Sequence, residues 1–232
     1  MSEIETDTRD ALLARVRASL SRKAGDELTE PVPEVDDRLA RLADHDDDLI
    51  AMFEQRAQEV GMQVYRCTAE QAPLRIAGAV AMLGVRKAVV DREIAQGLID
   101  IDAVLTQSGV ALIDWSGVGS DQGFGPQYDA DLGVTGVAAA LAETGTLVIH
   151  SRPSSSRGLS LVPHNHLAVV RASEILPDML DYWQSLAGIS GKDLPSSQVF
   201  ITGPSKTADI EGVLIQGVHG PGQVVIVLIE NA

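Results

Sequence analysis

One carboxylate, Glu143, has a setting in which it could do chemistry. It is the only acid within the Ala-rich part of the segment 131–146, directly before a Thr-Gly turn. A carboxylate at a strand end can act as a nucleophile or a general base. The alternative is that Glu143 makes a local contact and that Gly145 only supplies a positive φ. The residues predicted to contact a ligand beside Glu143 are Thr144, Gly145 and Thr146, with Asp131 as a further candidate.

The segment 202–211 offers a second place for an anion. It resembles a P-loop, but the pattern G-x-x-x-x-G-K-[ST] requires glycines where this chain has Phe200 and Ser205, so nucleotide hydrolysis of that type is excluded. Alternatively, Asp209 or Glu211 simply neutralises the ammonium group of Lys206 in this segment. The backbone N–H groups, hydroxyls and ammonium that suit an anion belong to Gly203, Ser205, Lys206 and Thr207.

A third polar segment, before the apolar run HLAVV, carries Arg152 and Arg157 in an otherwise acidic chain. Guanidinium groups on a polar loop suit a carboxylate or a phosphate, and Arg157 is the predicted contact. His164 and His166 could share one strand face and bind a metal with a third ligand such as His219. Because the sequence does not identify that third ligand, structural histidines are the better interpretation. We predict no metal site and keep His164 and His219 as further candidates for ligand contact.

The longest polar segment, residues 115–131, contains four glycines and almost no apolar period, which is typical of a binding loop or a lid. Gly117 and Gly119 match the start of the dinucleotide pattern G-x-G-x-x-G. The sixth position of that pattern is Gln122, and no helix is expected to follow. The sequence therefore does not predict NAD binding.

Composition excludes several other functions. The chain has 18 Lys and Arg against 33 Asp and Glu, a formal charge of −15, whereas nucleic acids and anionic membranes require a basic face. The single cysteine, Cys67, excludes an intrachain disulfide, a Cys-only zinc site and an iron–sulfur cluster held by this chain alone. The acidic start is unlike a secretory signal, and no apolar run reaches the roughly 18 residues of a membrane span. We expect a cytoplasmic protein.

The N-terminal region is predicted to be a helical appendage. Apolar residues at offsets 0, 1, 4 and 8 from Leu12 form one stripe of a short helix, which Asp7 or Thr8 could cap. An acidic linker with two prolines follows, so we divide the chain into residues 1–37 and a domain of residues 38–232. We expect the helix to pack on the domain or on a neighbouring subunit, because its apolar face has no partner nearby in the sequence. A homo-oligomer would provide one.

The domain is predicted to be a three-layer α/β/α fold with a mostly parallel sheet. A helix from Leu39 to Val60 should come first, and its acidic residues 44–48 fit a solvated face or a new helix start better than a metal site. Short apolar runs then alternate with helical patterns, which indicates parallel strands buried on both faces. A later helix from Ser173 should place Trp183 in the core. The expected strands are MQVYRC, KAVVD, GVALID, TLVIH, HLAVV, QVFIT and VVIVLI.

Ligands bind beyond the carboxyl ends of parallel strands. If the polar segments above follow such strands, they converge at one edge of the sheet. We therefore expect Glu143, Arg157 and Lys206 to line one cleft.

Four of these motifs together resemble the LUD-domain family, and within it the lactate-utilisation protein C group. They are DLGVTGVAAALAETGT, PHNH, TGPSKTADIE and GVHGP, and the resemblance covers roughly residues 40–230. It implies a fold similar to the NagB, ribose-5-phosphate isomerase and CoA-transferase superfamily. It also implies a role in bacterial oxidation of L-lactate to pyruvate, alongside two partner proteins that carry iron–sulfur clusters, with no cofactor in this chain.

The resemblance leaves two functions open. In the first, the protein is an assisting subunit that binds lactate, pyruvate or a related anion and docks onto redox partners. In the second, it is an enzyme similar to CoA transferases, in which the glutamate of a Glu-x-Gly motif forms an acyl-thioester, and Glu143-Thr144-Gly145 has that form. We favour the first function because the Glu-x-Gly motif is short and weakly specific, no CoA site is evident in the sequence, and fold does not determine activity.

Overall fold

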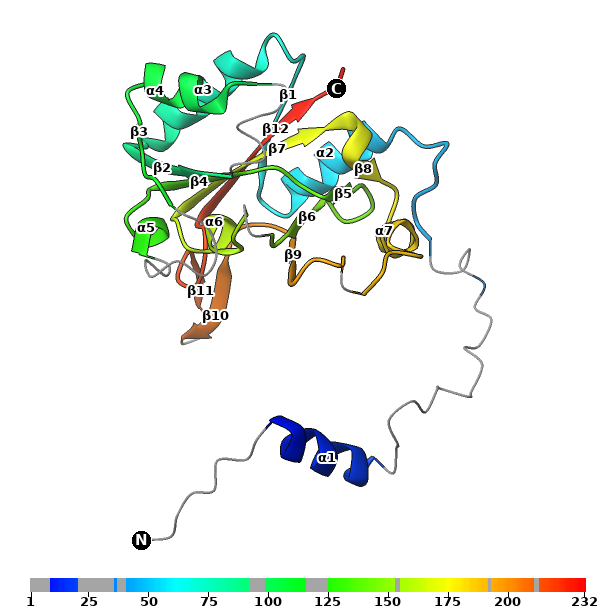
Figure 1. Ribbon diagram of the computed structural model, residues 1–232. Helices are drawn as coiled ribbons and strands as arrows, with labels where there is room; N and C mark the ends of the chain where they lie inside the picture. Colours follow the sequence, from blue (N-terminus) through cyan, green and yellow to red (C-terminus); the bar gives the residue numbers. More distant parts are fainter. Residues whose placement is uncertain are drawn as a thin grey trace, which may run out of the picture. The chain divides into compact units, whose positions relative to one another are not determined.

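In the computed structural model, a six-stranded parallel sheet forms the middle of residues 40–232 (Figure 1). The strand order is β1-β12-β7-β4-β2-β3, and neighbouring strands are paired in parallel. The prediction of an α/β fold with a mostly parallel sheet is confirmed. The strands are β1 (Gln63–Cys67), β2 (Lys87–Val90), β3 (Ala111–Leu112), β4 (Leu132–Thr135), β7 (Asn165–Arg171) and β12 (Gln223–Ile229).

The structure describes part of the chain, namely residues 9–20, 36, 41–91, 99–115, 125–152, 155–191, 193–210 and 213–232. Met1–Leu39 is a separate unit, in which helix α1 (Arg9–Ser19) has no buried residue. The expected caps Asp7 and Thr8, most of the predicted linker and residues 116–124 of the predicted binding loop lie outside the described residues. Within the described ranges, no helix is long and apolar enough to cross a membrane.

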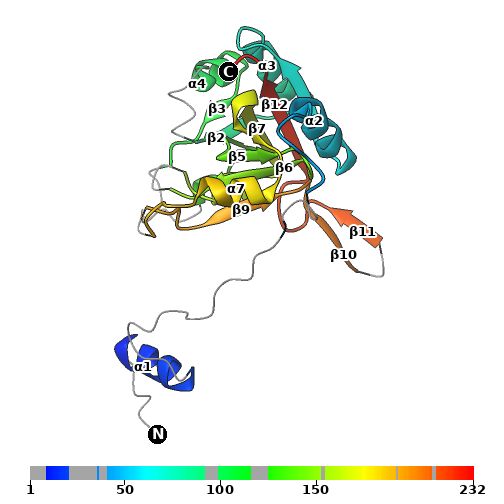
Figure 2. The ribbon, with the colours of Figure 1, turned by 90° about the vertical axis from the view of Figure 1, so that its right-hand side faces the viewer.

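The two faces of the parallel sheet are covered differently (Figure 2). Helices α3 (Ala72–Leu83) and α4 (Ile101–Gln107) pack on one face, whereas α2 (Leu49–Glu59) and a smaller sheet pack on the other. Successive side chains of β12 alternate between these two cores, so that Val225 and Val227 belong to one and Val224 and Ile226 to the other. This explains why the run VVIVLI has no polar residue.

The smaller sheet has the order β8-β5-β6-β9. Strands β5 and β6 form an antiparallel hairpin, and β9 is antiparallel to β6. Two predicted strands, TLVIH and QVFIT, are therefore β6 and β9 of a second sheet and not part of the parallel one. Apolar runs indicate burial but not direction, which is why the sequence did not separate them. Their bounds are β5 (Ala139–Leu141), β6 (Thr146–His150), β8 (Ile175–Leu176) and β9 (Gln198–Ile201), and β10 (Lys206–Ile210) pairs with β11 (Val213–Gln216) in a hairpin.

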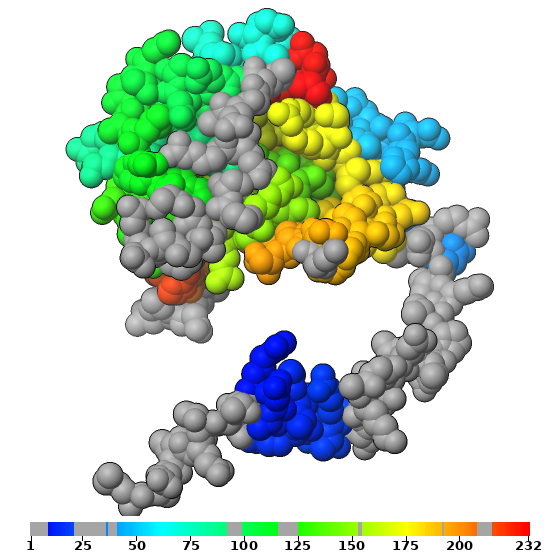
Figure 3. Space-filling view, in the orientation of Figure 1, coloured from blue at the N-terminus to red at the C-terminus, as the bar shows by residue number. Residues whose placement is uncertain are grey.

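The predicted helix from Ser173 was wrong in its start and in its buried side. Residues Ala172–Glu174 form a 3₁₀ turn, β8 follows, and helix α7 (Met179–Ser185) begins only after Asp178, whose side chain accepts from the N–H groups of the first turn. In this register Tyr182 is 1% exposed, while Trp183 is 48% exposed instead of buried. Helix α7 and the segment after it, gold to orange, lie on the surface in Figure 3.

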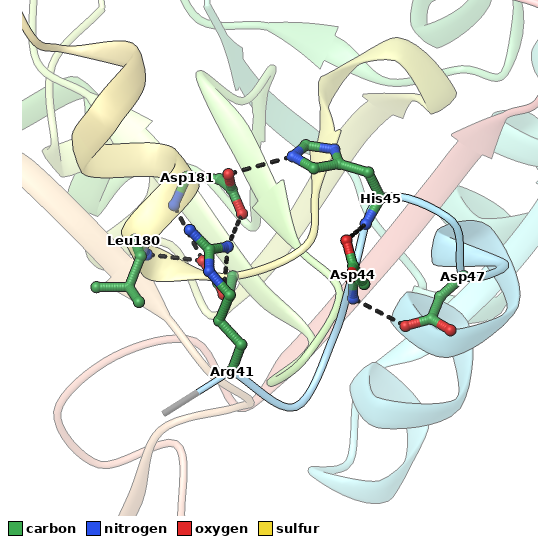
Figure 4. A network of polar contacts seen from close by, with 7 residues as sticks. Arg41, Asp44, His45, Asp47, Leu180 and Asp181 are labelled. Atoms are coloured by element: carbon green, nitrogen blue, oxygen red, sulfur yellow. Dashed lines mark hydrogen bonds and ion pairs between the residues drawn. The ribbon is translucent and has the colours of Figure 1, made fainter. Parts of the chain in front are cut away.

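Helix α2 starts ten residues later than predicted. Asp48 caps it by accepting a hydrogen bond from the Ala51 N–H group at 3.1 Å, so the acidic cluster is indeed a helix start. Gly61, at φ +97°, follows its end as expected. Upstream, Arg41 pairs with Asp178 at 2.9 Å and with Asp181, which fastens this segment to α7 (Figure 4). The remaining short helices are α5 (Gly125–Tyr128) and α6 (Gly158–Leu161).

Candidate functional site

A cavity of about 430 Å³ opens at the carboxyl ends of the parallel strands. Asp91 directly follows β2, Gly136 follows β4, Arg171 ends β7 and Ile229 ends β12, and all four line it. This is the edge at which open α/β sheets bind ligands, and the volume is at the small end of the usual range for ligand sites. Strand β6 and helix α7 complete the wall with His150, Tyr182, Ser185 and Leu186.

Two arginines and two carboxylates give the cavity its charge. Arg171 contacts Glu174 through its guanidinium at 3.1 Å and through its backbone N–H at 2.8 Å. Burial raises the pKa of Glu174. Arg152 is exposed and lines the cavity, and its backbone pairs with that of Ser155. The cavity can therefore offer guanidinium groups to an anion.

Two hydrogen-bonded pairs complete the polar lining. The Ser155 hydroxyl donates to the buried carboxylate of Asp91 at 2.6 Å. The Nε2 atom of His150 lies 2.7 Å from the Tyr182 hydroxyl. Burial lowers the pKa of His150, with a further contribution from Arg152, and burial raises the pKa of Tyr182. Near pH 7 this pair is a neutral imidazole beside a protonated phenol.

Gly145, expected to contact a ligand beside Glu143, packs against helix α2 instead. The hairpin turn between β5 and β6 brings Gly145 against the α2 backbone, where an added Cβ would lie 2.6 Å from the Arg56 carbonyl carbon. Gly145 has φ +66°. The hydroxyls of Thr144 and Thr146 are 2.7 Å apart, and Thr146 also contacts Thr202 at 2.8 Å. Gly145 therefore has the positive φ that the sequence alternative proposed, and it also lies too close to α2 to carry a side chain.

The Lys206 segment packs against the end of the same helix. The Lys206 ammonium donates to the Val60 carbonyl oxygen at 3.0 Å, and an added Cβ on Gly203 would lie 2.8 Å from that oxygen. A cation near the last carbonyls of a helix is stabilising. Ser205 contributes backbone hydrogen bonds to Pro221 and Gly217. Thr207 pairs with Ile215 in the β10–β11 hairpin.

Glu143, Arg157 and Lys206 were expected in one cleft, but none of them lines the carboxyl-end cavity. Residues 143–146 join two antiparallel strands and residues 202–205 follow the antiparallel β9, so the premise of parallel strands was wrong for both. Glu143 is half-buried, and burial followed by the nearby Asp178 raises its pKa. Its N–H group donates to the Pro177 carbonyl at 2.9 Å. Arg157 is exposed at the start of α6.

The remaining candidates lie where parallel strands begin. Asp131 precedes β4 and accepts from the N–H groups of Arg86 and Lys87 at 2.9 Å each. His164 precedes β7 and lines a second cavity of about 350 Å³ together with Gly61 and Gln63. His219 is exposed before β12.

His166 does not pair with His164 in a metal site. It is fully buried in β7, with its Nε2 atom 2.8 Å from the Thr135 hydroxyl. Burial lowers the pKa of His166 to about 4. In the described ranges, no three His, Cys, Asp or Glu side chains are grouped so that they could hold a metal ion.

Sequence reasoning missed most of the cavity, although a signal was available. Asp91, His150 and Arg171 each directly follow or end an apolar run, in KAVVD, TLVIH and HLAVVR. The rule that ligands bind at the ends of parallel strands would have selected Asp91 and Arg171, whereas His150 ends the antiparallel strand β6. Tyr182 had no such signal, because only the register of α7 turns it inward.

Comparisons with known proteins agree with this fold. The LUD domain family model matches residues 50–229. Lactate utilization protein C of Exiguobacterium sp. is 43% identical over 104 residues, which are 44% of this chain and 45% of that protein. Lactate utilization protein C of Bacillus licheniformis is 35% identical over 127 residues, 53% of this chain and 52% of that protein. The chain thus matches about half the length of these relatives.

Two further matches extend over more of the chain. Lactate utilization protein C of Shouchella clausii is 26% identical over 228 residues, 96% of this chain and 98% of that protein. The crystal structure of a DUF162 family protein from Deinococcus radiodurans superposes with a TM-score of 0.56 at 22% identity, covering 78% of this chain and 96% of that one. At that identity the structural match establishes the fold alone.

Proposed function

The chain belongs to the LUD-domain family, and from this premise we propose that it is the cluster-free component of a bacterial L-lactate utilisation system. Several relatives carry the name lactate utilization protein C, and one of them aligns over 96% of this chain. Within that system the protein binds a small carboxylate, such as L-lactate or its oxidation product pyruvate.

The cavity at the carboxyl ends of the sheet is the observation that carries this proposal. It places Arg152 and Arg171 in one concave site, and guanidinium groups are the side chains best matched to a carboxylate. Asp91 and Glu174 also line the cavity, so the attraction for an organic anion comes from the directed hydrogen bonds of the guanidinium groups and not from a net positive charge. The apolar side chains of Ile149, Val169 and Leu186 suit a short hydrocarbon substituent.

Calorimetric titration with L-lactate and pyruvate tests the proposal. Arg152→Met keeps the aliphatic stem but removes the charge, and a lost charge-assisted hydrogen bond should weaken binding by about ten-fold or more. Arg75→Met is the matched control, because Arg75 is an exposed arginine on α3 that does not line the cavity. Equal affinities for the two variants, or no binding by the wild type, would contradict the assignment of the site.

We also propose that the redox centres of this system are on iron–sulfur partner proteins, since the chain has a single cysteine, Cys67, which is buried. This part of the proposal depends on the family resemblance. Co-purification of the tagged chain with iron-containing proteins tests it, and stoichiometric iron in the isolated chain would contradict it.

The CoA-transferase alternative receives less support. A nucleophilic glutamate would have to face the bound substrate, yet Glu143 does not line the carboxyl-end cavity. We therefore place the ligand in the carboxyl-end cavity and not at Glu143.

A further inference from the structure

We infer that the carboxyl-end cavity selects carboxylates with an oxygen on the second carbon, and that His150, positioned by Tyr182, is the residue that recognises this oxygen. The inference rests on the proposed carboxylate site and adds a specificity element to it. It assigns the arginines to the carboxylate and the imidazole to the neighbouring hydroxyl or keto group.

The imidazole of His150 has one nitrogen engaged and one available. His150 ends β6 and lines the cavity, and its Nε2 atom is 2.7 Å from the Tyr182 hydroxyl. Among the described residues, this is the one hydrogen bond of the ring. The Nδ1 atom therefore keeps its hydrogen-bonding capacity for a ligand.

Tyr182 holds the ring in a defined orientation because it is itself fixed. It is 1% exposed, and its ring makes an edge-on contact with Phe200 at a centroid distance of 5.6 Å. A side chain fixed by packing in this way is suited to position a residue that contacts the ligand.

The two tautomers of His150 determine which oxygen can be recognised. When the Tyr182 hydroxyl donates to Nε2, the proton of the neutral imidazole is on Nδ1, which then donates to a hydroxyl or a keto oxygen. When Nε2 donates to Tyr182, Nδ1 becomes an acceptor and matches a hydroxyl only. Because burial raises the pKa of Tyr182, its hydroxyl remains available as the donor. Both 2-hydroxy and 2-oxo acids thus fit the same pair.

Charge separates the two roles within the cavity. Burial lowers the pKa of His150, with a further contribution from Arg152, so its imidazole is neutral near pH 7 and suits an uncharged oxygen. The guanidinium groups of Arg152 and Arg171 remain charged and suit the carboxylate. Asp91 and Glu174 also line the cavity, and their carboxyl groups disfavour a ligand with a second carboxylate. The chemical class is therefore a short monocarboxylate.

Comparison of L-lactate with propionate tests the inference, because propionate is lactate without its 2-hydroxyl. We expect the wild type to bind L-lactate about ten-fold more tightly than propionate, the factor expected from one well-made hydrogen bond. His150→Gln places an amide near the former Nε2 position, which can still reach Tyr182, and removes Nδ1. This variant should bind both acids about equally, with its propionate affinity within about two-fold of the wild type.

Tyr182→Phe isolates the positioning role. It removes the hydroxyl that orients His150, and the preference for lactate should fall to about three-fold while propionate binding stays the same. Tyr128→Phe is the matched control, since Tyr128 is 76% exposed on α5 and should keep the full preference. A purely structural effect would instead weaken the binding of both acids and leave the ratio of their affinities unchanged.

Two outcomes overturn the inference in different ways. Equal wild-type affinities for lactate and propionate would overturn the role of His150 while leaving the proposed carboxylate site intact. If the wild type binds neither acid, both the carboxylate site and the inference are overturned. If His150→Gln fails to fold, the wild-type ratio and Tyr182→Phe still decide.

Discussion

The two ends of the parallel sheet use polar residues in opposite ways. Where the strands begin, the Gly145 and Lys206 segments contact the end of α2, which leads directly into β1. Where the strands finish, Arg152, Arg171 and His150 line a cavity. The Gly145 and Lys206 segments, where the strands begin, resemble binding motifs in sequence but pack against α2 in the structure. The residues where the strands finish form no sequence motif, yet they have the geometry of a binding site.

Glycine-rich motifs have two physical origins, and the two ends of the sheet separate them. A glycine can allow a ligand to approach the backbone, or it can allow another part of the chain to approach it. At Gly145 the approaching group is the α2 backbone. The close approach of α2 therefore explains Gly145 without a ligand.

Gly145→Ala should have the largest effect on this comparison. The added Cβ would lie 2.7 Å from the Ala57 Cα atom in a residue with φ +66°, so both overlap and backbone strain oppose it. We expect the free energy of unfolding to fall by about 3 kcal/mol, measured by urea denaturation. The lactate affinity of the folded protein should change by less than about two-fold.

Gly109→Ala is the matched control for that variant. Gly109 also has a positive φ, of +79°, but an added Cβ would meet no atom within 4 Å. Gly109→Ala should lower the free energy of unfolding by about 1 kcal/mol, because only the backbone conformation opposes it. Similar losses for the two glycines would show that packing against α2 is not what Gly145 provides.

The largest contribution to the pH dependence of stability should come from the buried His166, between the two ends. Burial lowers the pKa of His166 to about 4 from its ordinary 6.5, so between these values the unfolded chain binds a proton that the folded chain does not. Stability should therefore fall as the pH drops, by about 2 kcal/mol between pH 7 and pH 5. His150, whose pKa burial also lowers, acts in the same direction. Burial raises the pKa of Glu143 and Glu174, which act in the opposite direction.

Urea denaturation of His166→Leu at both pH values measures this contribution. The variant should lose most of the pH dependence, whatever its absolute stability. His164→Leu changes an exposed histidine two residues away and should retain the wild-type slope. Identical slopes for the two variants would assign the pH dependence to other groups.

Lys206→Met should have the smallest effect. The exposed ammonium of Lys206 contributes one hydrogen bond to the Val60 carbonyl oxygen, so its loss should lower the free energy of unfolding by about 0.5 kcal/mol. Calorimetry should find lactate affinity unchanged within about two-fold. A ten-fold loss would instead return the anion site to the Lys206 segment and remove the contrast between the two ends.

Much of the fold could be predicted from the sequence, but less of the site. The runs KAVVD and VVIVLI predicted buried strands because a strand covered on both faces has no polar side. The same signal could not distinguish β6 and β9, since antiparallel strands in a second sheet are equally apolar. The candidate cleft was assigned to Glu143 and Lys206 on that mistaken direction.

The family, the acidic charge and the apolar runs that form the sheet can all be read from the amino-acid sequence alone. These properties are local, because each depends on residue types and their spacing along a few turns or strands. Only the tertiary structure decided which polar side chains meet. Ser155 reaches Asp91 across 64 positions and His150 reaches Tyr182 across 32, because strand order and direction bring them together. No local pattern encodes those contacts, since they depend on packing between elements that are distant in the chain.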